Sequence, residues 1–234
     1  MNKQTNLVIL GDSNAKGVVR DIQDKYVVAP NSTVNLISEK TGWETHNISF
    51  FGQTLEKAYK KGFVQKVLQY KSDKLRNIVV INLGGNDSDY DWTKVSKEPT
   101  ERHSSRTNLD NFEKYYRESI HFLRENGFEV YMCTLLPFVP KLYFDTVVSK
   151  LGSAHNIMFY LDNDVNNLLA DQINFNERII EIAKSEKVKL LDLRALIQKN
   201  KNWKKLYCDD GIHLSENGHL YLAKKVIETY VEKK

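Results

Sequence analysis

The sequence contains only two cysteines, Cys133 and Cys208, among 234 residues. So few thiols cannot build a disulfide framework, and their scarcity suits a reducing compartment. No apolar run approaches the roughly 20 residues that a membrane-spanning helix needs. The N-terminus leads into a run of only four apolar residues (7–10), which is shorter than the h-region of a signal peptide. We therefore expect a cytoplasmic protein without a membrane span, while the sequence leaves export by another route open.

A strong excess of either charge is also missing. Lys and Arg number 34 against 30 for Asp and Glu, so the formal net charge is +4. The densest basic cluster, at 199–205, is expected to be solvated surface rather than a nucleic-acid patch. The hydrophobic share of 41% and the charged share of 27% are typical of a globular protein. Nucleic acid is thus not an expected partner, and the oligomeric state is left undecided.

Short apolar runs alternate with longer segments of helical periodicity, a rhythm typical of βα units around a parallel sheet. Five strands are predicted, at 6–10, 44–50, 77–83, 129–134 and 189–193. A last helix is predicted to begin after Ser215, which is a suitable N-cap. The length and the absence of repeats or linkers predict a single domain over 1–234.

Two segments interrupt this rhythm. Residues 88–108 are polar and are predicted to form a long loop, while 137–174 form a longer insertion rich in aromatic residues and asparagine. Such long loops are uncommon in compact domains and are often functional. The insertion is either a substrate lid or sugar-stacking surface, or an accessory unit of packed helices. The sequence supports both.

Residues suited to nucleophilic catalysis follow several of the predicted strands. Ser13 follows the first strand, while Asp210 and His213 follow the fifth. Because sites in open α/β sheets gather at the carboxyl ends of strands, we expect these residues to converge on one rim. A serine hydroxyl becomes a good nucleophile when an imidazole accepts its proton and a carboxylate orients the imidazole. The sequence therefore predicts a catalytic triad of Ser13, His213 and Asp210.

Acyl transfer also requires hydrogen-bond donors aimed at the oxyanion that forms. The backbone N–H groups of Ser13 and Gly52 and the side-chain amide of Asn86 can supply three of them. Gly52 suits this role because a missing side chain lets the substrate approach the backbone. The Gly-x-Ser-x-Gly elbow of α/β-hydrolases is absent, because Ala15 occupies the place of its second glycine.

Four blocks of the chain resemble the SGNH (GDSL-type) hydrolases in order and spacing. They are Gly11-Asp12-Ser13, Gly52 within 47–54, Gly84-Gly85-Asn86-Asp87 and Asp210-Gly211-Ile212-His213. The resemblance extends from residue 7 to about residue 223. It implies a flavodoxin-like, three-layer α/β/α sandwich with a five-stranded parallel sheet. It also implies ester hydrolysis without a metal or cofactor, with the triad and the oxyanion hole given above. Asp12 is structural by this resemblance, and Asn14 replaces a residue that is usually hydrophobic.

The substrate class stays open within this resemblance. We favour a small-molecule or glycan ester, with removal of acetyl or other short acyl groups from a carbohydrate. Lipase or thioesterase activity, and acyl transfer to an acceptor other than water, would use the same triad. A catalytically silent binding module, closed by the long insertion, is the alternative from another functional class.

Asp87, Asp89, Asp91 and Glu98 repeat carboxylates at the spacing of a calcium-binding EF-hand loop. That loop requires glycine at its sixth position, where this chain has Trp92. The segment also follows a predicted strand, whereas an EF-hand loop follows a helix. We predict a polar loop at the rim of the active site and no metal.

Overall fold

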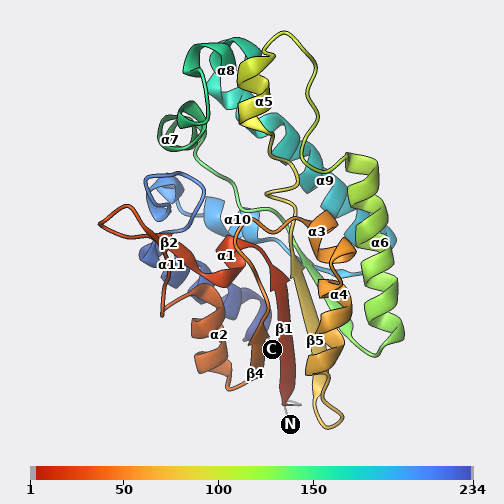
Figure 1. Cartoon of the computed structure of the whole chain (residues 1–234). Coiled ribbons are helices and arrows are strands. Elements are labelled where there is room, and N and C mark those ends of the chain that lie inside the picture. The colour runs from red at the N-terminus through yellow and green to blue at the C-terminus, as the bar shows by residue number, and fades with distance from the viewer. Residues whose placement is uncertain (1–3, 233–234) are drawn as a thin grey trace.

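The computed structural model describes residues 4–232, and the chain forms three layers (Figure 1). The central sheet has five strands in the order β4-β1-β5-β6-β7, all parallel. Counted along the chain within this sheet, that order is 2-1-3-4-5, which is the flavodoxin-like order. The predicted fold class is therefore confirmed.

All five predicted strands are present with shifted ends. They are β1 (Thr5–Gly11), β4 (Glu44–Asn47), β5 (Arg76–Asn82), β6 (Glu129–Cys133) and β7 (Lys189–Leu191). The strand predicted at 44–50 ends three residues early, although the N–H groups of Ile48 and Phe50 still donate to β1 carbonyls before the turn at Gly52. The strand predicted at 189–193 also ends early, because Asp192 already caps the next helix by accepting from the Ala195 N–H.

Helices cover both faces of the sheet. One face carries α3 (Leu55–Lys60), α4 (Phe63–Lys66), a 3₁₀ turn (Val67–Tyr70), α6 (Leu109–Glu125) and α9 (Leu169–Ser185). The other carries α1 (Ser13–Lys16), α2 (Thr33–Thr41), α10 (Leu193–Gln198), a 3₁₀ turn (Trp203–Leu206) and α11 (Glu216–Val226), which continues as a π-helical turn (Ile227–Val231). Ser215 caps α11 as predicted. Within residues 4–232, no helix is both long and apolar enough to cross a bilayer.

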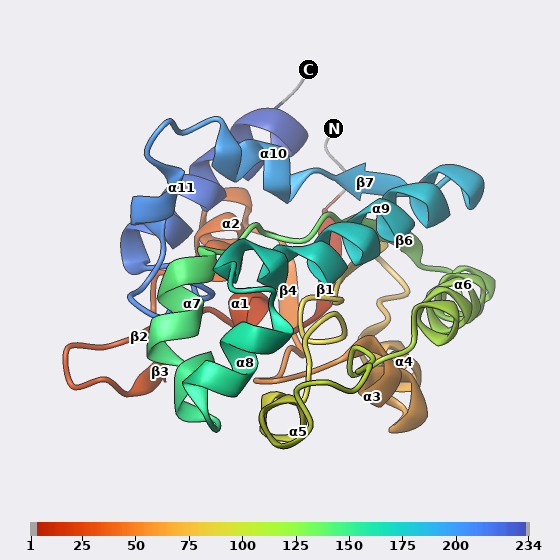
Figure 2. The same cartoon turned by 90° about the horizontal axis from the view of Figure 1, so that it is seen from above.

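A cap of short helices lies beyond the carboxyl ends of the strands (Figures 1 and 2). It consists of α5 (Trp92–Lys97), α7 (Pro140–Thr146), a 3₁₀ turn (Val148–Lys150), α8 (Ala154–Tyr160) and a 3₁₀ turn (Val165–Leu168). These elements share an apolar cluster in which Trp92 packs with Phe144 and Ile157. The prediction of an uninterrupted loop at 88–108 is thus wrong at α5, and 137–174 folds largely as helices.

A hairpin of β2 (Val18–Arg20) and β3 (Tyr26–Val28) projects from the main body (Figure 2). The sequence did not lead us to expect this hairpin, although two valine-rich stretches separated by five residues, four of them polar, are a usable hairpin signal. Arg20 anchors the hairpin to the loop that precedes α11, because its Nη1 lies 2.7 Å from Asp209 Oδ2.

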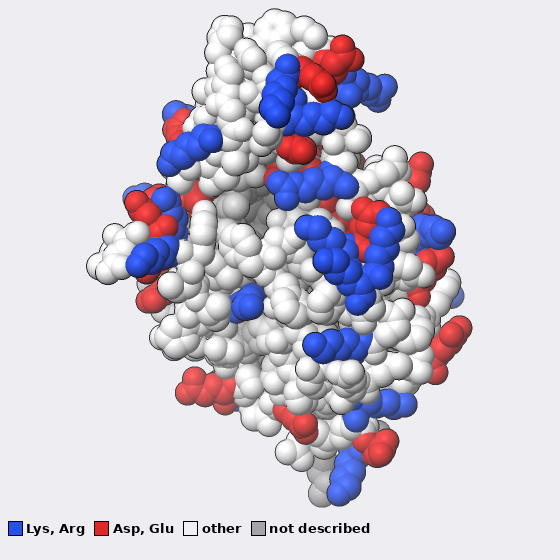
Figure 3. Space-filling model, in the orientation of Figure 1, with Lys and Arg blue, Asp and Glu red and all other residues white. Residues whose placement is uncertain are grey.

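Charge of both signs is mixed on the face seen in Figure 3. Lys and Arg side chains gather over the part of this face that α3 occupies in Figure 1, and acidic side chains lie among them. Lys60 and Glu56 of α3, for example, form an ion pair at 2.6 Å. Such mixing is typical of solvated protein surface.

Candidate active site

Ser13 lies at the turn where β1 meets α1. Gly11 is required there, because a Cβ atom at this position would lie 2.4 Å from the Cβ of Ala15. Asp12 caps α1, and its carboxylate accepts a hydrogen bond from the Asn14 N–H at 2.9 Å. Ser13 is the first residue of α1, so its own N–H has no acceptor within the helix. The turn therefore presents both the hydroxyl and the N–H of Ser13 at the end of the sheet.

The three residues predicted as a triad form one chain of hydrogen bonds. His213 Nε2 lies 2.8 Å from Ser13 Oγ, across 200 residues of sequence. His213 Nδ1 lies 2.6 Å from Asp210 Oδ2. The second carboxylate oxygen of Asp210 accepts the backbone N–H groups of Ile212 and His213, both at 3.0 Å. In this arrangement the imidazole can take the hydroxyl proton while the carboxylate holds its orientation.

The electrostatics of the site favour an ionised Asp210. Burial opposes ionisation of this carboxyl group, but hydrogen bonds from the His213 ring and from two backbone N–H groups outweigh it, so the pKa of Asp210 lies below its usual value. A buried carboxylate beside Nδ1 stabilises the imidazolium that forms when His213 accepts a proton. The neighbouring Asp12 differs, because burial raises its pKa to about 6.

The predicted oxyanion donors come from two loops that meet beside Ser13. Asn86 and Ser13 line the same cavity, and Asn86 Nδ2 donates one hydrogen bond to the Gln53 carbonyl at 3.0 Å. An amide nitrogen carries two hydrogens, so the second can serve a ligand. Gly52 precedes Gln53 and has φ of +64°, while a Cβ there would meet no atom within 4 Å. Glycine is therefore required at 52 by its left-handed backbone conformation and not by lack of space.

Two aromatic rings that sequence analysis missed lie against His213. The Tyr26 ring, from β3, has its centroid 5.1 Å from that of the imidazole, and the Phe51 ring stacks at 5.7 Å. Partial burial and the neighbouring Asp210 carboxylate raise the pKa of Tyr26 to about 12. No local sequence pattern marks these two residues, because their contact with His213 joins segments far apart in the chain.

A cavity of about 100 Å³ opens beside Ser13 and His213. The loops after β1 and β5 line it, and the segment 137–174 adds Phe138, Tyr143 and Leu168 to the lining. The insertion thus borders the candidate site. Because ligand pockets for drug-sized molecules span roughly 300–1,000 Å³, this cavity suits a much smaller group.

The carboxylates with EF-hand spacing have separate structural partners. Asp87 is fully buried and accepts the Leu55 N–H at 2.8 Å, which ties it to the start of α3. Asp89 accepts the indole N–H of Trp92 at 2.8 Å, and Asp91 caps α5. Within residues 4–232, no group of three or more His, Cys, Asp and Glu side chains is arranged to hold a metal ion.

Comparison with known proteins adds to this geometry. The profile of the GDSL-like Lipase/Acylhydrolase family matches residues 9–220. A search of curated proteins found no match. Among solved structures, a lipase/acylhydrolase from Enterococcus faecalis is 15% identical with a TM-score of 0.59, covering 96% of this chain and 94% of its own.

Two further structures have the same fold. An acetyl xylan esterase, AlAXEase, is 22% identical with a TM-score of 0.60, covering 96% of this chain and all of its own (100%). A member of the lipolytic G-D-S-L family from Veillonella parvula is 14% identical with a TM-score of 0.60, covering 97% and 98% of the two chains. The profile covers most of the chain, including the Ser13 turn and the Asp210–His213 segment, so this chain belongs to the GDSL-like lipase/acylhydrolase family.

Proposed function

We propose that the protein is a serine esterase that cleaves short-chain carboxylic esters through an acyl-enzyme. The observation that carries this proposal is the chain of hydrogen bonds from Ser13 through His213 to Asp210. Ser13 Oγ attacks the ester carbonyl as His213 Nε2 takes its proton. His213 then passes the proton to the departing alcohol, and water repeats the sequence on the acyl-enzyme.

The negative oxygen of each tetrahedral intermediate is held by the N–H groups of Ser13 and Gly52 and by the second amide hydrogen of Asn86. The Ser13 N–H is free of helical pairing at its place in α1, and the Asn86 side chain is fixed by Gln53. Donors held in place before the reaction cost no reorganisation when charge develops on the oxygen.

The acyl group is short, and acetyl on a carbohydrate is the preferred case. The cavity beside Ser13 holds about 100 Å³ and is closed on one side by Phe138 and Tyr143. The exposed rings of Tyr26 and Phe51 border the catalytic imidazole, where the alcohol part of the substrate would lie. The acetyl xylan esterase of the same fold supports this preference through its name.

Hydrolysis of nitrophenyl acetate, butyrate and octanoate by the purified protein tests the proposal. We expect the acetate to be preferred and Ser13→Ala to lower kcat by about 10⁴-fold or more. Ser104→Ala, at an exposed serine in the 88–108 segment, is the matched control and should behave as wild type. A fluorophosphonate probe should label wild type once, at Ser13. A folded protein that stays unlabelled and inactive would instead be a binding module.

Product analysis separates hydrolysis from the other chemistries of the same triad. With an acetylated sugar and an added alcohol, we expect free acetate as the main product. Predominant transfer of acetyl to the alcohol would identify an acyltransferase, and a clear preference for acyl thioesters would identify a thioesterase.

A further inference from the structure

A second cavity, much larger than the one at Ser13, lies between the sheet and the helices on its α2–α11 face. Its volume is about 870 Å³. It extends from Arg76 and Lys189, the first residues of β5 and β7, to Asn14 and Asn82 at the other end of the sheet. Asn14 and Asn82 also line the active-site cavity, so the two cavities share a wall without sharing Ser13 or His213.

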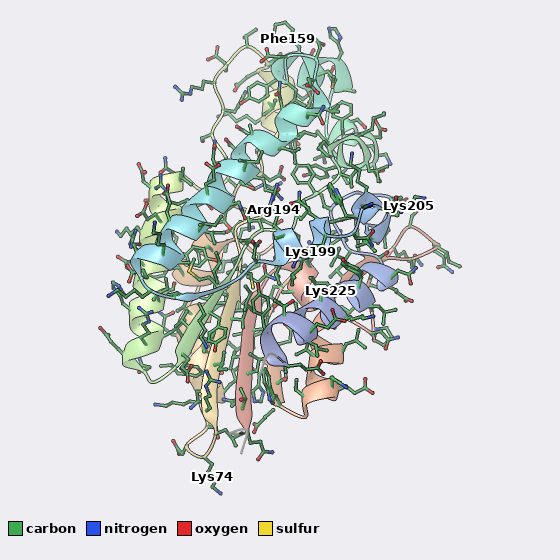
Figure 4. All side chains as sticks on the ribbon, turned by 180° about the vertical axis from the view of Figure 1, so that it is seen from behind. Lys74, Phe159, Arg194, Lys199, Lys205 and Lys225 are labelled. Atoms are coloured by element: carbon green, nitrogen blue, oxygen red, sulfur yellow. The ribbon has the colours of Figure 1, made fainter. Side chains whose placement is uncertain are left out.

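The walls of this back cavity are mainly aliphatic. Alternate residues of the strands face it, as expected for one side of a pleated sheet. The aliphatic lining comes from the strands and from α2 and α11, and includes Leu7, Ile9, Ile78, Val80, Leu191, Val34, Ile37, Leu222 and Val226. Figure 4 looks onto this side of the molecule, where the strands are seen beside α11, which carries Lys225. From residue 5 to residue 9 of β1 alone, the floor is about 13 Å long.

One end of the back cavity is cationic. Arg76 Nη2 and Lys189 Nζ both donate to the Tyr131 hydroxyl, at 3.0 and 3.1 Å. Arg76 is also paired with Glu129, whereas Lys189 has no carboxylate within ion-pair distance among residues 4–232. Lys40 adds a third cation to this lining.

The acid content of the lining is low. In the part of the chain that the structure describes, Glu232 is the single acidic residue that lines the cavity, against the three cations. A long aliphatic space with cations at one end matches an alkyl chain that carries a carboxylate. It does not match a sugar, which needs many polar partners, or a neutral hydrocarbon, which gains nothing from the lysines.

We propose that the back cavity binds a free long-chain fatty acid, with the carboxylate beside Arg76 and Lys189 and the alkyl chain along the sheet toward Asn14. The volume lies within the range of pockets that enclose whole small molecules. This site is independent of the ester-cleaving site, since its lining contains none of the triad.

Calorimetric titration with saturated carboxylates from octanoate to palmitate, below their micellar concentrations, tests the proposal. We expect one saturable site per chain and an affinity that rises about three- to fourfold for each added methylene until the cavity is full. Ser13→Ala, with its inactive triad, should bind carboxylates as wild type does. Binding in the back cavity is therefore tested independently of whether the protein is an esterase.

Two variants locate the ligand. Ile37→Trp fills the cavity from α2 and should abolish binding of dodecanoate, with folding checked by circular dichroism. Lys189→Gln should weaken dodecanoate about tenfold while leaving dodecanol unchanged. Lys184→Gln, on the exposed side of α9, is the matched control.

Three outcomes would overturn the proposal. One is no saturable binding of any carboxylate. Another is binding that survives Ile37→Trp and disappears after fluorophosphonate labelling, which would place the ligand at Ser13. The third is a stable dimer in sedimentation that Ile37→Trp dissociates, because a second copy of the chain would then cover this face.

Discussion

The side-chain amide of Asn14 donates a hydrogen bond to the backbone carbonyl of Ile212 at 3.0 Å. Its Oδ1 accepts the backbone N–H of Leu214 at 3.2 Å. The residue that follows the nucleophile therefore binds the backbone on both sides of His213. A hydrophobic side chain at position 14 could make neither bond, so Asn14 helps to fix the distance from Ser13 to the imidazole.

Asn14→Ala should remove both bonds and lower kcat about 10- to 100-fold, because each hydrogen bond contributes about 1 kcal/mol to the placement of His213. KM should change little, since Asn14 is expected to position the imidazole and not the substrate. Steady-state kinetics on a nitrophenyl acetate series measures both constants. Asn111→Ala, at an exposed position of α6, is the control. An unchanged kcat in Asn14→Ala would show that the His213 loop holds itself in place.

Tyr26→Ala should lower kcat/KM about tenfold, while Tyr26→Phe should stay close to wild type. The ring packs on the His213 imidazole, which is hydrogen-bonded to Asp210, so its loss should loosen the imidazole. An aromatic contact of this kind is worth about 0.5–1.5 kcal/mol. The phenylalanine variant keeps the ring and removes only the hydroxyl. Equal activity of the alanine and phenylalanine variants would mean that the hairpin does not act on the imidazole.

Phe138→Ala should shift the acyl preference toward longer chains, because it enlarges the cavity that Phe138 and Ser13 both line. We expect the ratio of kcat/KM for hexanoate over acetate to rise by about tenfold or more, through burial of the added methylenes. The variant should also lose about 3 kcal/mol of stability, the usual cost of this core substitution. Phe159→Ala changes a residue of the same insertion that is 53% exposed and lies at the far end of the cap (Figure 4). That control should leave the ratio unchanged, and an unaltered ratio in Phe138→Ala would place the acyl group elsewhere.

His219 should make the free energy of unfolding depend on pH. It is fully buried, and burial lowers its pKa from 6.5 to about 4. Because the folded pKa is depressed, the neutral form stabilises the fold above pH 6.5, and this stability is lost as pH falls toward 4. The loss is about 3 kcal/mol. Urea unfolding at several pH values should therefore show a smaller decrease over this interval in His219→Gln than in wild type. Parallel curves for the two proteins would contradict the assignment.

The sequence was informative wherever local pattern and function coincide. The apolar runs predicted β1 and β5, whose central residues are buried on both faces of the sheet. The edge strand β4 reads Glu-Thr-His-Asn and is partly exposed, so the alternation of strands and helices, and not an apolar run, predicted it. The strand ends then indicated where Ser13, Asn86 and His213 would meet. The structure brings Ser13, His213 and Asp210 into hydrogen-bond contact, and their catalytic roles stay a prediction.

Other features depend on contacts that local pattern does not encode. Helices as short as α7 and α8, of seven residues each, are stabilised mainly by packing. Two turns of hydrophobic periodicity are too few to predict such a helix from the sequence. The hairpin that carries Tyr26 is anchored by Arg20 to Asp209, a residue 189 positions away. The glycine at 52 was predicted for its bare backbone, whereas its conformation is what requires it.

His213 and Asp210 belong to the last part of the chain, which packs on the α2–α11 face of the sheet. The larger apolar cluster lies on the opposite face, under α3, α6 and α9. If residues 206–232 detach, Ser13 loses its proton acceptor although the apolar cluster under α3, α6 and α9 stays folded. Esterase activity should therefore fade at a lower urea concentration than helical circular dichroism does. Loss of turnover would then report detachment of the carboxyl-terminal segment before the rest of the chain unfolds.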